Sequence, residues 1–226
     1  MLLHTELRSI QEYQSVLQAI HSGSTGLAEI DSKSRIQDTA KTAKYVKRLS
    51  ELEIIEKEYR FLDHPNSKKH LYRIKNNFIA FYYHFVWRNQ AARAFMDEDD
   101  FYDTFIRDDL DDYVSVRFEK ICEQYLVRTY RRRNHEPITD IGRYWYNDHR
   151  RRTDVEIGLC VKTSTHIHVY ECKWTNDLIG EGVMNGLIEK GSYLEASRYG
   201  AFSRSGYHDD VSDKGYDLIT IEDMFE

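Results

Sequence analysis

The chain has 226 residues and a net charge of −6, and 41% of its residues are hydrophobic. This is enough for one large domain or two small ones with a well-formed core. No apolar run approaches the roughly 18 residues of a membrane span, and the N-terminus lacks the basic-then-apolar order of a signal peptide, so we expect a cytoplasmic protein without a membrane segment. The cysteines are far apart, which argues against a disulfide framework or a zinc site, and we expect Cys122, Cys160 and Cys172 to be reduced and mostly buried.

The charge is unevenly distributed. Residues 128–152 hold eight Lys and Arg against three Asp and Glu, a net charge of +5, whereas residues 153–226 hold six against fourteen, a net charge of −8. A basic segment beside an acidic one suits a site that binds divalent cations and has a phosphate-binding rim. Solvated surface charge is the alternative explanation.

Three short helices and a hairpin are predicted in the first 75 residues. Apolar residues recur there at helical spacing, and Asp38 or Thr39 can cap the third helix. We expect helices over 10–20, 27–36 and 39–50, and strands over 54–62 and 70–75. This order is typical of a winged helix-turn-helix, and YVKRLSELEIIEK resembles the end of a recognition helix followed by the first wing strand.

The middle of the chain is expected to be helical. The segment 76–95 is aromatic on all sides and too short for a membrane span, which predicts a helix buried between two domains. An acidic stretch follows, and a further helix is predicted over 111–130, because Val114, Phe118 and Cys122 recur at helical intervals and the aspartates lie near its N-terminus.

Beyond residue 152 the apolar pattern changes to a period of two. Strands are predicted over 152–162 and 167–174, joined as a hairpin by a polar turn, and then a helix within 180–200, a strand over 199–207 and a short strand near the C-terminus. The expected order after the acidic stretch is helix, strand, strand, helix, strand.

Two pairs of charged residues stand out on the predicted hairpin. Residues i and i+2 of a strand point to the same face, so Asp154 shares a face with Glu156, and Glu171 shares a face with Lys173. If the strands pair, three carboxylates and one ammonium converge, and carboxylates of this kind bind Mg²⁺ or Mn²⁺. The alternative is a salt-bridged surface of little energetic value.

The arrangement resembles the PD-(D/E)XK nuclease superfamily, whose core has an acid on a helix, an acid on a strand and Glu-X-Lys on the next strand. The motifs FEKIC, DVEIG and YECKW carry the resemblance. It implies catalytic roles for Glu119, Glu156, Glu171 and Lys173, and metal binding by Asp154, Glu156 and Glu171, with Mg or Mn as cofactor. Lys173 would position the attacking water.

A more specific resemblance covers roughly residues 8–226. The motifs LYRIKNNFIAFYYHFVWRN, FEKICEQYL, IGRYWYN, DVEIGL, YECKW and AFSRSGY are similar, in this order, to the C-terminal region of an uncharacterised group of archaeal and bacterial AAA-type ATPases. No P-loop motif occurs in this chain, so it is expected to be a stand-alone relative or the C-terminal half of such an ATPase. Members of the group read Glu-Ile-Asp where this chain reads Asp154-Val155-Glu156.

The predicted fold class is α+β. The resemblance implies a winged helix-turn-helix domain over 1–75, an aromatic helical connector over 76–108, and a restriction-endonuclease-like PD-(D/E)XK domain with a mixed sheet over 109–226. Basic side chains on the third helix and in two arginine runs are expected to bind nucleic acid, either in the major groove or at phosphates. These residues are Lys41, Lys44, Arg48, Arg131, Arg132, Arg133, Arg150, Arg151 and Arg152.

Two functions remain open. The first is a DNA-binding protein whose nuclease-like domain hydrolyses phosphodiesters with Mg or Mn. The second is a catalytically inactive module that docks DNA or a protein partner in an ATPase system, which the exchanged acids at 154 and 156 and the missing ATPase favour. DNA and an AAA-type ATPase are the expected partners.

Overall fold

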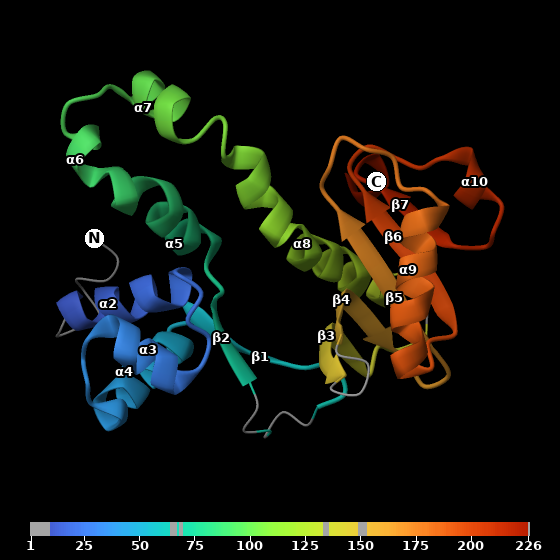
Figure 1. The fold of residues 1–226 in the computed structure, drawn as a ribbon, viewed down its shortest axis with the longest axis horizontal. Coiled ribbons are helices and arrows are strands. Elements are labelled where there is room, and N and C mark those ends of the chain that lie inside the picture. Colours follow the sequence, from blue (N-terminus) through green and yellow to red (C-terminus); the bar gives the residue numbers. More distant parts are fainter. Residues whose placement is uncertain (1–9, 64–66, 68–69, 133–135, 149–152, 226) are drawn as a thin grey trace. The chain divides into compact units, whose positions relative to one another are not determined.

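The computed structural model of the chain describes residues 10–63, 67, 70–132, 136–148 and 153–225 (Figure 1). The described residues form two compact units, one within 1–59 and 65–108 and the other within 60–64 and 109–226. The protein is of the α+β class, as predicted, with a five-stranded mixed sheet in the second unit. None of the helices described is long and apolar enough to cross a bilayer.

The first unit begins with the expected three helices and hairpin. Asp38 accepts a hydrogen bond from the backbone N–H of Lys41 at 3.0 Å and so caps the third helix. The two strands pair antiparallel, with Ile55 opposite Ile74. The elements are α2 (Ile10–His21), α3 (Leu27–Ser34), α4 (Thr39–Glu51), β1 (Ile55–Tyr59) and β2 (His70–Ile74).

One hydrophobic core joins these elements. Each helix contributes the apolar face that its spacing predicts, and β1 and β2 add Ile55 and Tyr72. The helical contributions include Val16, Leu17, Ile30, Val46 and Leu49, all at most 2% exposed.

The aromatic segment after β2 differs from its prediction as one buried helix. It is helical but irregular, and a π-helical turn interrupts it. Phe78 is 65% exposed and Phe95 is 91% exposed, so its aromatic residues do not all pack inside. The segment consists of α5 (Asn77–Phe81), the π turn η1 (Tyr82–Val86), the 3₁₀ turn η2 (Trp87–Asn89) and α6 (Gln90–Arg93), and α7 (Glu98–Phe105) follows.

In the second unit, helices cover both faces of the sheet (Figure 1). The strand order is β3-β4-β5-β6-β7, in which β3, β4 and β5 pair antiparallel and β6 and β7 add in parallel. The elements are α8 (Leu110–Arg132), β3 (Asp140–Asp148), β4 (Thr153–Lys162), β5 (Ile167–Lys173), α9 (Glu181–Gly191), η3 (Ser192–Leu194), β6 (Arg198–Ser203), α10 (Asp209–Ser212), β7 (Asp217–Thr220) and η4 (Glu222–Phe225).

The strand β3 was missed by the sequence analysis, which places no strand over 140–148. The predicted hairpin of β4 and β5 is present, and it extends into a three-stranded antiparallel meander. The added strand is the outer neighbour of the acidic strand β4, and it therefore supplies side chains to the region of the predicted site.

Two cores lie on opposite faces of the sheet. Met184 and Leu187 of α9 pack with Ile157, Cys160 and Val169 on one face. On the other face, α8 contributes a core with residues of β4, β5, β6 and η4, which include Phe118, Cys122, Leu159, Val161, Tyr170, Phe202 and Met224. The cysteines are free thiols, buried at 122 and 160 and partly buried at 172, as expected.

Candidate functional site

The residues of β5 alternate regularly between the two faces of the sheet. Val169 belongs to the core under α9, whereas Tyr170 and Cys172 belong to the core under α8. Because alternate residues share a face, Glu171 and Lys173 project to the face that α9 covers. The Glu-X-Lys pair is therefore on one face, as predicted.

The strand β4 contains a bulge that changes this alternation. Gly142 pairs with Cys160 and Tyr144 pairs with Ile157, so two residues of β4 oppose the single residue Arg143 of β3. On the C-terminal side of the bulge, Cys160 faces α9; on the N-terminal side, Ile157 also faces α9. Gly158 and Leu159 therefore both face α8, and the extra residue places Glu156 on the α8 face as well.

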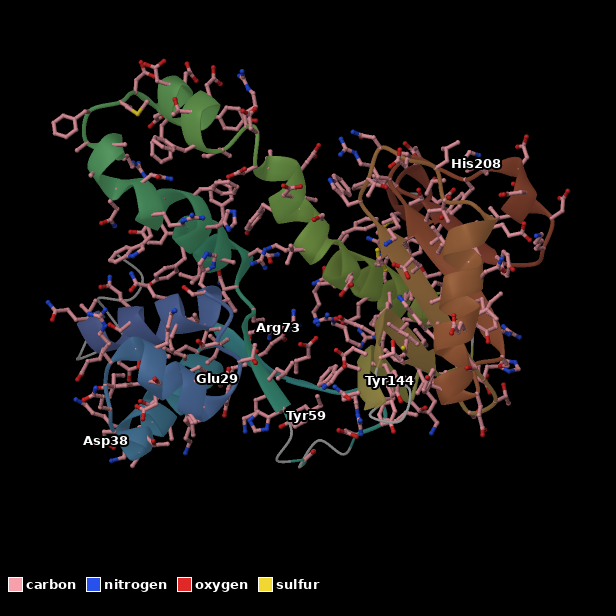
Figure 2. All side chains as sticks on the ribbon, viewed as in Figure 1. Glu29, Asp38, Tyr59, Arg73, Tyr144 and His208 are labelled. Atoms are coloured by element: carbon pink, nitrogen blue, oxygen red, sulfur yellow. The ribbon has the colours of Figure 1, made fainter. Side chains whose placement is uncertain are left out.

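An arginine joins the two predicted acids on the α8 face. The Nε atom of Arg143 lies 3.1 Å from Oε2 of Glu119, and its Nη2 atom contacts Oε1 of Glu156. The Arg143 side chain is 20% exposed, whereas those of Glu119 and Glu156 are 35% and 60% exposed. The structure thus brings Glu119 of α8 and Glu156 of β4 together through a guanidinium. Tyr144, the next residue of β3, is labelled in Figure 2.

A glycine allows Glu119 to approach the strand. A Cβ atom at Gly158 would lie 2.3 Å from Oε1 and 2.6 Å from Cδ of Glu119, well inside van der Waals contact. Only a residue without a side chain therefore fits at the bulge while Glu119 keeps its position. Asp154, two residues before Glu156, is exposed.

The Glu-X-Lys pair of β5 forms its own ion pair, in which Nζ of Lys173 lies 3.1 Å from Oε1 of Glu171. The two groups of acids are at the same end of the sheet, because Cys172 is within electrostatic range of both Glu119 and Glu171. Burial is the main cause that raises the pKa of the Cys172 thiol, and a hydrogen bond with Cys122 and the negative charges of Glu119 and Glu171 raise it further. Cys172 is therefore an inert, protonated thiol.

The predicted ligands do not fit a single metal centre in this arrangement. Among the residues that the structure describes, no group of three or more His, Cys, Asp or Glu is arranged to bind a metal ion. Arg143 lies between Glu119 and Glu156, and Glu171 projects from the opposite face of the sheet. The expected convergence of three carboxylates and a lysine is not present, because the bulge in β4 moves Glu156 to the α8 face.

The basic residues predicted on α4 are exposed in the case of Lys41 and Lys44 and partly exposed in the case of Arg48. The helix buries Thr42, Tyr45, Val46 and Leu49, and Lys41, Lys44 and Lys47 are exposed. Lys41 pairs with Glu12, a contact that raises the pKa of this lysine, and Arg48 lies 3.4 Å from Glu51. Asp38, labelled in Figure 2, marks the N-terminus of this helix.

The arginine runs are described only in part. Arg131 is exposed on α8, where it borders a hollow of about 490 Å³. The other residues that line this hollow are Lys120, Glu123, Gln124, Val127 and Arg128. The side chain of Arg132 and the residues Arg133, Arg150, Arg151 and Arg152 lie outside the described part of the chain.

Arg143 is the site residue that the sequence analysis missed. It lies in the motif IGRYWYN, on the strand that was not predicted. A period-two reading of residues 140–148 would have placed Arg143 and Trp145 on one face, beside the acids of β4. Trp145 is in fact paired directly with Glu156.

Comparisons with known proteins give relatives of unestablished function. The profile of the DUF234 family, described as archaeal and bacterial proteins of unknown function, matches residues 82–185. An uncharacterised protein of Methanocaldococcus jannaschii, MJECL04, is 32% identical over 147 residues, which are 64% of this chain and 32% of that protein. The chain thus spans about a third of the length of this curated relative.

Among solved structures, protein VC1899 from Vibrio cholerae aligns with 97% of this chain and 55% of its own, at 14% identity and a TM-score of 0.38. It is the family profile that gives the similarity of the central part of the chain, over residues 82–185, to archaeal and bacterial proteins of unknown function.

Proposed function

We propose that this chain is a DNA-docking module, built from a winged helix-turn-helix and a nuclease-like domain, that serves an AAA-type ATPase. The exposed basic side of α4 is the observation that carries the proposal. α4 is the third helix before the hairpin, the position of a recognition helix in winged-helix proteins; Lys44 lies on the side opposite to its buried residues, and Lys41 is exposed at the edge of that side.

The ion pairs on α4 do not prevent such a role. Exposed pairs such as Lys41 with Glu12 contribute roughly 0–1 kcal/mol, so a DNA phosphate can replace the carboxylate at little cost. Binding of phosphates also releases counterions from DNA, which makes the interaction favourable at low salt.

The order of elements in the second unit supports a nuclease-like scaffold. A helix with Glu119 precedes three antiparallel strands, of which β4 bears Glu156 and β5 bears Glu171 and Lys173, and helices cover both faces of the mixed sheet. This is the order of the core that the resemblance implies. The ion pairs of the acids with Arg143 and Lys173 favour docking over catalysis.

Fluorescence anisotropy with labelled duplex DNA tests the proposal. Lys41→Glu and Lys44→Glu should each weaken binding by about tenfold and reduce the slope of affinity against salt by about 1. The matched control is Lys214→Glu, because Lys214 also pairs with a carboxylate, that of Glu181, and is similarly exposed, 40% against 45% for Lys41. Equal affinities of all four proteins would exclude α4 as the DNA-binding element.

A metal-dependent phosphodiesterase is the second candidate, because three elements in the expected order bear the expected acids. Incubation of the full chain with supercoiled DNA and Mn²⁺ separates the two candidates. Nicking that is lost in both Glu171→Ala and Lys173→Ala would establish the enzyme. Absence of nicking, together with DNA binding that depends on Lys41 and Lys44, would establish the docking module.

A further inference from the structure

A cluster of three charged side chains, two carboxylates and one guanidinium, lies on the α8 face. Glu119 and Glu156 come from different elements, and Arg143 contacts both. A guanidinium remains protonated at all accessible pH values, so Arg143 is a permanent cation. The three groups together carry one negative charge, and without Arg143 they would carry two.

Arg143 contacts carboxylate oxygens of Glu119 and Glu156, and such oxygens are also metal ligands. Mg²⁺ and Mn²⁺ bind such oxygens, and they commonly use only one or two carboxylates and complete their coordination with water. Glu156 is 60% exposed, so water can reach this position. The guanidinium thus occupies the space between two oxygen ligands that a hydrated divalent cation could also bridge.

We propose that Arg143 takes the place of a divalent cation between Glu119 and Glu156: it connects α8 to the bulge of β4 and keeps metal ions out of this position. The proposal makes Arg143 a positioning residue, and removal of its charge should convert the two glutamates into a binding site for Mg²⁺ or Mn²⁺. It goes beyond DNA docking, since it concerns the second unit alone.

Calorimetric titration of the full chain with Mn²⁺, and thermal unfolding with and without Mn²⁺, test this. The wild-type protein should show no Mn²⁺ binding that depends on Glu156. Arg143→Gln should unfold at a lower temperature, gain Mn²⁺ affinity by at least about tenfold, and recover part of its lost stability when Mn²⁺ is added. The double variant Arg143→Gln/Glu156→Gln should lose the gained affinity.

The matched control is Arg204→Gln. Arg204 also forms an ion pair in the second unit, 2.9 Å from Asp111, but it bridges no second carboxylate in the contacts described. This variant should lose stability without gaining Mn²⁺ affinity.

Three results would overturn the proposal. They are Mn²⁺ binding by the wild-type protein that Glu156→Gln abolishes, an Arg143→Gln variant that folds without gaining Mn²⁺ affinity, and an Arg143→Gln variant that stays unfolded with Mn²⁺ present. An Arg143→Gln variant that folds only with Mn²⁺ would support it strongly. Mn²⁺ binding by the wild-type protein that depends on Glu156 would also favour the phosphodiesterase candidate. None of these results bears on DNA binding by α4.

Discussion

Replacement of Gly158 by alanine should destabilise the second unit, because it displaces Glu119. The new Cβ would lie 2.3 Å from Oε1 of Glu119, and ordinary contact begins near 3.4 Å, so the carboxylate must retreat by about 1 Å. That shift breaks the 3.1 Å contact between Glu119 and Arg143. The end of a flexible side chain can move, so we place the loss of unfolding free energy at about 1–2 kcal/mol, the lower part of the range for overpacking.

Differential scanning calorimetry of the full chain measures this loss. For a unit of roughly 120 residues, 1 kcal/mol corresponds to about 4 °C, so its transition should fall by about 4–8 °C. Gly186→Ala is the matched control. Gly186 is inside α9 and no atom lies within 4 Å of its added Cβ, so alanine should raise stability by about 0.5–1 kcal/mol. Shifts of the same sign in both variants would refute the argument.

Three further predictions concern polar groups outside the candidate site. Tyr170→Phe should lower the unfolding free energy by about 1–3 kcal/mol, because the buried hydroxyl lies 2.9 Å from both Nδ1 of His168 and Oδ2 of Asp217. Urea denaturation measures this loss, and an unchanged midpoint of unfolding would contradict the prediction. Hydrogen bonds from Ser164, Thr163 and Thr165 lower the pKa of Glu136 from 4.5 to about 2. The stability that Glu136 adds is therefore complete above pH 4.5 and is lost as the pH falls towards 2, so wild type and Glu136→Gln should differ at pH 7 and converge in acid. In the first unit, Asp31 accepts hydrogen bonds from Thr42 at 2.6 Å and Thr39 at 2.9 Å, and Asp31→Asn should lower the calorimetric transition of that unit while the second transition stays in place.

Local signals predicted much of the fold. Asp38 marks the start of α4 because an aspartate side chain can accept the hydrogen bonds of free backbone N–H groups, and this effect acts over a few residues. The hairpin of β4 and β5 follows from alternation around a polar turn, and the position of Glu119 on a helix follows from the spacing of Phe118 and Cys122. These features need no knowledge of distant parts of the chain.

Features that depend on tertiary pairing were not predicted. β3 carries Arg143, Gly142 and three successive aromatic residues, so it lacks the alternation of a half-buried strand, and its pairing with β4 determines its conformation. The exposure of Phe78 and Phe95 also contradicts the prediction, made from hydrophobicity alone, that the segment 76–95 is a buried helix. The ion pairs of Arg143 depend on both β3 and the bulge, so sequence spacing could not reveal them.

The bulge in β4 has a consequence for the comparison of related proteins. A relative that keeps both residues between Ile157 and Cys160 but pairs this strand without the bulge would have the same acids in the same order, and its strand would alternate without interruption. In that protein, the residues corresponding to Asp154 and Glu156 would project beside Glu-X-Lys instead of towards α8. The presence or absence of the bulge would thus separate metal-binding proteins from metal-free ones in one lineage, and the pairing of this strand would classify them better than the identity of the acidic residues.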